Sequence, residues 1–182
     1  DLTPYKDPRK LSQLRSSLLA LPSEGKASGD DMNRFETFIL AKIAEFTWPA
    51  RDAVKDTAEQ RRMLLKREIK MYGGSDAKAP DLHDFFNATV LRIVPTLVEN
   101  EGLDPSVRYN YMILLGQLDK LEFILGVRAI PDPVPECTTI LIDKLHKESL
   151  SEALRVAAWV GLERQSEMNL SPPSRQAIVA EA

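Results

Sequence analysis

The sequence is poor in several residue types that mark specialised classes of protein. Its single cysteine, Cys137, excludes an intramolecular disulfide framework and a cysteine-rich metal site. Aromatic residues make up 7%, and no apolar run approaches the roughly 20 residues that a membrane-spanning helix needs. Neither sign of charge dominates, because 24 Lys and Arg face 27 Asp and Glu, for a net charge of -3. That balance argues against non-specific electrostatic binding to nucleic acid or to anionic lipid.

What the sequence does contain is the composition of an ordinary soluble globular domain. Its 182 residues are 43% hydrophobic and 28% charged, and a domain of this length buries roughly 70% of its unfolded surface. The chain begins at Asp1 without Met or a signal peptide, and Pro172-Pro173 opens a helix that runs into the last residue. We therefore expect a mature form or an excised piece of a longer protein.

Apolar residues recur at helical spacing in seven segments that are bounded by capping residues, proline or glycine. Pro95 lies inside one of these segments and is expected to bend the helix or break its hydrogen-bond ladder. No segment alternates polar and apolar residues with β-branched enrichment, so we predict an all-α fold. The predicted helices cover approximately 7–21, 32–48, 51–72, 80–100, 104–118, 135–147 and 151–164.

Two of these segments, 104–118 and 151–165, align with each other at a constant offset of 47 residues. Each is preceded by another predicted helix, and a helix pair that recurs every 40 to 47 residues is typical of HEAT arrays. The segment 107–118, VRYNYMILLGQL, resembles the second helix of a HEAT repeat, V-R-x-x-A-x-x-A-L-G-x-L. Asp104-Pro105 resembles the turn between the helices of that repeat. The segment 154–162 is a weaker second copy, from which Gly161 departs.

The resemblance to HEAT-repeat (armadillo-like) proteins implies an α-solenoid of antiparallel helix pairs over residues 80–182. Residues 1–75 then form a helical N-terminal section, either divergent repeats or a cap on the end of the array. The family's arginine implies structural roles for Arg108 and Arg155, with acidic neighbours such as Asp104 and Glu152 as partners. The resemblance leaves the compartment open, since HEAT-like domains occur in exported bacterial proteins and in cytoplasmic ones.

The resemblance also implies which side chains meet a partner. In the HEAT pattern, six residues of the two second helices face outward along the concave side of the array: Tyr109, Met112, Gly116, Val156, Trp159 and Glu163. Four of them are apolar, and apolar and aromatic groups on such a surface indicate a binding site. Tyr109, Met112, Val156 and Trp159 are therefore the candidate partner-binding residues, for another protein or another domain of the parent chain. The simpler reading is that the connector 120–135 covers them.

Three features resemble catalytic or ligand-binding motifs, and each has a simpler structural reading. His83-Asp84 resembles the metal-binding doublet of the HD phosphohydrolases, but no histidine precedes it. Cys137 begins a predicted helix, where a thiolate is favoured, but no histidine lies near it in the sequence. Gly73-Gly74 follows a helix, the reverse of the order that a phosphate-binding loop requires. We predict no catalytic, cofactor-binding or metal-ligating residue.

The helix predicted over 51–72 carries a basic stripe. Arg62, Lys66 and Lys70 share one face at a spacing of four residues, with acidic residues nearby. A solvated face with ion pairs is the simpler reading, and contact with nucleic-acid phosphates is the alternative.

The function predicted from the sequence is a non-catalytic scaffold for protein or interdomain interactions. The alternatives are an all-helical enzyme with an inter-helix pocket and nucleic-acid binding through 51–72.

Overall fold

The computed structural model describes residues 9, 12–14, 16, 27–48, 57–73, 80–123 and 130–181, except for the side chains of 66, 68–73 and 80. The predicted helix over 7–21 lies largely outside this range, as does the beginning of the helix predicted over 51–72. The chain divides into an N-terminal unit, residues 1–89, and a C-terminal unit, residues 90–182. The boundary falls inside a helix, whereas the sequence indicated a division before it.

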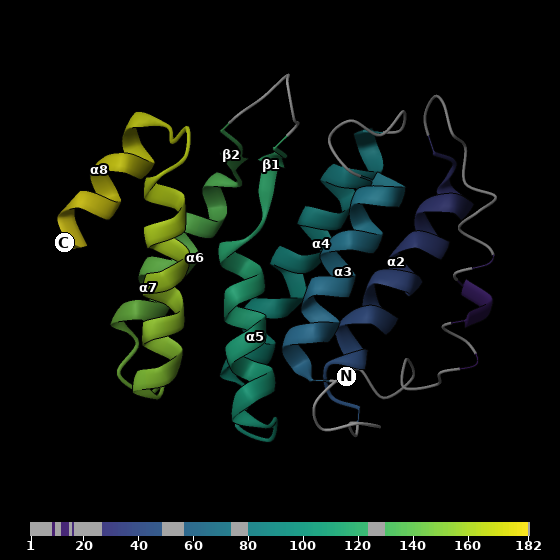
Figure 1. Cartoon of the computed structure of the whole chain (residues 1–182), viewed down its shortest axis with the longest axis horizontal. Coiled ribbons are helices and arrows are strands. Elements are labelled where there is room, and N and C mark those ends of the chain that lie inside the picture. Colours follow the sequence, from purple (N-terminus) through teal and green to yellow (C-terminus); the bar gives the residue numbers. More distant parts are fainter. Residues whose placement is uncertain are drawn as a thin grey trace. The chain divides into compact units, whose positions relative to one another are not determined.

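The described chain is mostly helical (Figure 1). This confirms the all-α prediction at the level of fold class. The sequence missed a two-stranded antiparallel sheet, β1 (Asp119–Leu121) with β2 (Asp132–Pro133), because such short strands show no alternation. The helices are α2 (Gly29–Glu45), α3 (Ala58–Gly73), α4 (Pro80–Glu99), α5 (Pro105–Gly116), α6 (Pro135–His146), α7 (Glu152–Ser166) and α8 (Pro172–Glu181).

Helix α4 runs through Pro95 and ends four residues later at Glu99, so the proline does not end the helix, although it has no backbone N–H to donate to the hydrogen-bond ladder. A proline inside a helix costs about 3 kcal/mol, through a lost hydrogen bond and a steric clash. Val90, Val94 and Val98 are fully buried at a spacing of four residues along the same stretch. Burying one such side chain contributes roughly 1.5–3 kcal/mol, so the packing of this face offsets the cost of the proline.

Capping side chains set the starts of two helices. Ser28 and Asp31 form a capping box at α2, in which each side chain accepts a hydrogen bond from the other's backbone N–H. The hydroxyl of Ser28 is the main cause that lowers the pKa of Asp31. α2 therefore starts at Gly29, inside a segment that the sequence assigned to a loop. Asp104 caps α5 by accepting from the backbone N–H of Ser106 at 2.8 Å.

The N-terminal unit is built around α2, α3 and the first half of α4. Arg61 on α3 is buried, and its Nη1 donates to the backbone carbonyls of Glu45 and of Trp48, the latter at 2.7 Å. This arginine therefore closes the C-terminal end of α2, where carbonyls lack helical partners. The core side chains of the unit include Phe35, Phe38, Ile39, Ile43, Phe46, Leu65, Leu82 and Phe86.

In the C-terminal unit, α7 packs along both α5 and α6, and α8 contacts α6 and α7. The end of α6 is tied to the end of α4, because Lys144 and Lys147 both form ion pairs with Glu99. The hydrogen bonds from Lys144 and then from Lys147 lower the pKa of Glu99. The core of the unit is formed by Val94, Tyr111, Met112, Leu114, Leu115, Leu118, Cys137, Leu141, Leu154, Ala157, Ala158 and Leu162.

The two arginines that the HEAT resemblance implied as structural form no ion pair with an acidic residue in the described part of the chain. The Nε of Arg108 donates to the backbone carbonyl of Val98 at 2.8 Å, which ties α5 to the end of α4. The carboxylate of Asp104 is engaged with Ser106 instead. The buried Nε of Arg155 has no hydrogen-bond partner in the described structure. A structural role therefore holds for Arg108, with a carbonyl as its partner.

Candidate interaction face on α5 and α7

Helices α5 and α7 lie against each other with their backbones in contact. A Cβ atom placed on Gly116 would lie only 2.6 Å from the Cα of Gly161, so no larger residue fits here without a shift. Both helices run in the same direction, since their C-terminal ends lie together (Figure 1). The two segments that align at an offset of 47 residues are therefore direct neighbours in space.

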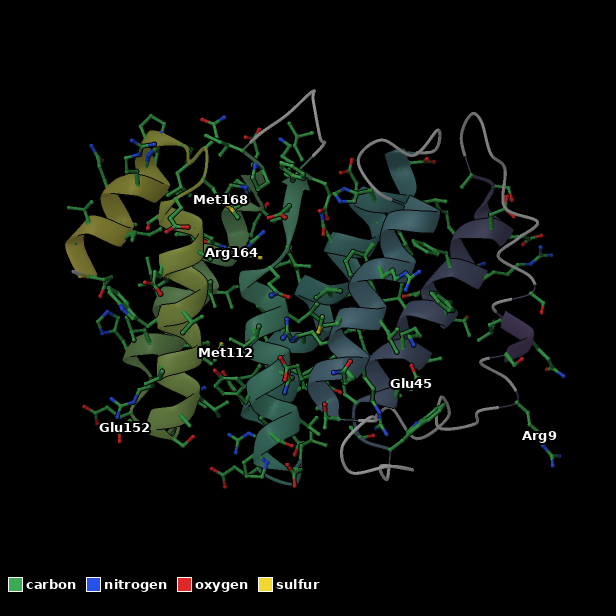
Figure 2. The ribbon with its side chains drawn as sticks, viewed as in Figure 1. Arg9, Glu45, Met112, Glu152, Arg164 and Met168 are labelled. Atoms are coloured by element: carbon green, nitrogen blue, oxygen red, sulfur yellow. The ribbon has the colours of Figure 1, made fainter. Side chains whose placement is uncertain are left out.

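Arg164 links the ends of these helices to the sheet (Figure 2). Its guanidinium donates to the carbonyl of Gly116 at 2.9 Å and to both carboxylate oxygens of Asp119 at 2.8 and 3.0 Å. The side chain of Asp119 is only 3% exposed, so this ion pair holds a buried charge. The sequence did not reveal this pair, because 45 residues separate the partners and the family pattern pointed to other arginines.

The prediction that Met112 and Gly116 face outward is wrong, because both are buried. At about 100° per residue, Met112 lies about 40° to one side of Gly116 around the axis of α5. Tyr109 and Ile113 lie about 20° and 60° to the other side. Gly116 touches α7, and Met112, on one side of this contact, is fully buried (Figure 2). Tyr109 and Ile113 lie on the other side of the contact, where Tyr109 is exposed and Ile113 is half-buried.

Tyr109 and Val156 are at the surface, as predicted, with exposed fractions of 36% and 51%. Trp159 is half-buried. It precedes the contact residue Gly161 by two positions and is therefore turned about 200° away from α5. The four candidate residues consequently do not share one surface. Of the connector that was expected to cover them, residues 124–129 lie outside the described range.

The apolar surface that does exist is shifted by one position from the predicted one. Val160 follows Val156 by one helical turn and is 40% exposed, and Ile113 follows Tyr109 in the same way and is half-buried. These four side chains, here called the α5–α7 patch, occupy matching positions at the offset of 47 residues. In Figure 1, α6 lies behind α7, against which it packs. The offset itself was the signal that could have identified Ile113 and Val160.

Acidic side chains border the patch along α7. Glu152, Glu163 and Glu167 are all exposed. Glu152 lies four residues before Val156, Glu163 lies three residues after Val160, and Glu167 lies four residues after Glu163, so they are neighbours on the helix surface. None of the three forms an ion pair with another residue in the described chain. On the side of α5, the nearest exposed charge after the patch is Lys120.

The motifs that resembled catalytic or metal sites take structural positions. Burial, followed by the charges of Glu136 and Asp119, raises the pKa of Cys137 to about 12, so its thiol is protonated at neutral pH. His83 is buried and Asp84 is exposed, so the doublet points in two directions. Within residues 27–48, 57–73, 80–123 and 130–181, no three His, Cys, Asp or Glu side chains lie close enough to hold a metal.

Part of the basic stripe on α3 is buried within the protein. Arg62, the first residue of the predicted face, is buried and lies 3.9 Å from the carboxylate of Glu59. Arg61 is buried at the end of α2. Arg67 is exposed, and the side chains of Lys66 and Lys70 lie outside the described range. The predicted ion pairing therefore holds at Arg62, whereas the prediction that this residue is solvated is wrong.

No helix among the described residues combines the length and the apolar character required to cross a bilayer. No protein-family model matches the chain, and comparison with the curated proteins and with the solved structures gives no match either.

Proposed function

We propose that residues 80–182 form a HEAT-like helical-repeat module that acts as a non-catalytic scaffold. In this proposal, the α5–α7 patch binds another protein or another domain of the parent chain. The observation that carries the proposal is the exposure of apolar side chains at matching positions of two repeated helices, with Val156 at 51% and Val160 at 40%. Apolar side chains that gather on one exposed face are typical of an interaction site.

The rigidity of the platform supports this function. The backbone contact between Gly116 and Gly161 and the buried pair of Arg164 with Asp119 fix α5 against α7. The patch is therefore ordered before a partner arrives. Binding to a preorganised surface avoids much of the entropy cost of ordering side chains and loops.

The repeat character rests on the way α5 and α7 are built. Each is the second of two consecutive helices, and they pack side by side with an offset of 47 residues in the sequence. Residues at equivalent positions, such as Tyr109 and Val156, share the same exposed face. Stacked helix pairs commonly present such continuous surfaces to partners.

The test is a pull-down with the full chain as bait. We expect the double substitution Val156→Ser and Val160→Ser to lose the partners that the parent chain retains. Serine and valine have similar helix propensities, so circular dichroism should show a folded protein. The matched control is Val179→Ser on α8, because Val179 is 69% exposed and lies outside the patch. Retention of the same partners by the double variant would contradict the proposal.

A further inference from the structure

We infer that the α5–α7 patch binds a basic amphipathic helix of a partner protein. This inference rests on the function proposed above. The exposed stripe of α7 has a defined order of side chains. Five exposed residues follow one another at spacings of three or four positions: Glu152, Val156, Val160, Glu163 and Glu167. The apolar centre of the stripe thus has carboxylates at both ends.

The charge of this stripe is not compensated within the described chain. Arg164, the nearest arginine after Val160, is committed to Asp119 and to the carbonyl of Gly116. Arg108 on α5 is committed to the carbonyl of Val98. The three glutamates form no ion pair with described residues, so they set a negative potential along this edge of the patch.

The shape of the surface suits a helix. Tyr109 with Ile113 and Val156 with Val160 form two parallel rows, each with a spacing of one helical turn. A third helix that lies along them buries apolar residues at positions i, i+3, i+4 and i+7. Lysine and arginine at the borders of that helix extend their long side chains to the glutamates while their aliphatic portions cover the valines.

The charges also disfavour other occupants. An acidic helix would place its carboxylates beside those of α7, and like charges that meet at an interface are costly. A second copy of this chain that docked through the same face would bring both sets of glutamates into one interface, since a two-fold contact uses the same surface on each copy. A basic helix is the occupant whose charge complements the edge.

The test uses two model peptides of about five helical turns with the same leucine stripe. One carries lysine on its polar face and the other carries glutamate, and binding to the full chain is measured by fluorescence anisotropy. At low salt we expect the lysine peptide to bind at least about tenfold more tightly than the glutamate peptide. This preference should shrink at high salt, because salt screens exposed charges.

Two variants assign the preference to the edge of the patch. The double substitution Glu163→Gln and Glu167→Gln should remove most of the preference for lysine, whereas Glu136→Gln should retain it. Glu136 is an exposed glutamate on α6 and lies outside the patch.

The inference is overturned if both peptides bind equally, if neither binds, or if sedimentation shows that the chain dimerises through the patch. Equal binding that is lost with Val156→Ser and Val160→Ser would still support an interaction patch. The failure of the charge argument is therefore distinguishable from the failure of the proposed function.

Discussion

Gly116→Ala is expected to destabilise the C-terminal unit by about 1–3 kcal/mol, although alanine is the better helix former by about 1 kcal/mol. The added Cβ would lie 2.6 Å from the Cα of Gly161, and a backbone atom cannot rotate away. The helices must then move apart, and the contacts that bury Met112 between them are loosened. A smaller loss is expected for Gly161→Ala, because its Cβ would lie 2.9 Å from the flexible side chain of Leu141 and 3.0 Å from the Cα of Gly116, a less severe backbone approach than 2.6 Å.

The measurement is urea unfolding, followed by circular dichroism and by the fluorescence of Trp159 in a Trp48→Phe background. Gly29→Ala is the matched control, because a Cβ on Gly29 meets no atom within 4 Å. We expect this control to be neutral or slightly stabilising. A Gly116→Ala protein as stable as the parent would show that α5 and α7 are not in backbone contact.

The second large effect is expected for Arg164→Met, which should lower the free energy of unfolding by about 3 kcal/mol. Removal of the guanidinium leaves the carboxylate of Asp119 buried without its bidentate partner, and it leaves the carbonyl of Gly116 without a donor. Breaking a buried pair from one side typically costs 3–5 kcal/mol, and the lower end applies because the side chain of Arg164 is partly exposed.

A double-mutant cycle separates this pair from a general effect of losing a charge. When Asp119→Asn is already present, Arg164→Met should cost clearly less than it does alone, because no buried carboxylate then loses the guanidinium. The control is Arg175→Met on α8, an exposed arginine for which we expect a change below about 0.5 kcal/mol. Equal costs of Arg164→Met in both backgrounds would contradict the role of the pair.

The sequence predicted those parts of the fold that depend on local signals. The boundaries of α5, α6 and α7 agree with the prediction to within a few residues, since Asp104-Pro105 and Pro135 begin helices in a recognisable way. The two helices related by the offset of 47 residues, α5 and α7, contact each other in the structure, as the proposed repeat requires.

The sequence could not predict features that depend on how the helices rotate against each other. A family pattern assigns Met112 to the outward face, but the close approach at Gly116 turns α5 so that Met112 is buried and Ile113 is half-exposed. The pair of Arg164 with Asp119 joins residues far apart in the sequence. In α4, tertiary packing outweighs the local effect of Pro95, which a pattern of single residues does not show.

The most direct test of the α5–α7 patch is hydroxyl-radical footprinting of the full chain, read by mass spectrometry. Tyr109 and Tyr111 have the same chemistry and lie two residues apart, but only Tyr109 reaches solvent. We expect oxidation of Tyr109, Val156 and Val160, with Tyr111 and Met112 protected and the exposed Met63 as the reactive reference. If Met112 is instead oxidised as fast as Met63 while Tyr109 is protected, α5 is rotated the other way and the proposed patch does not exist.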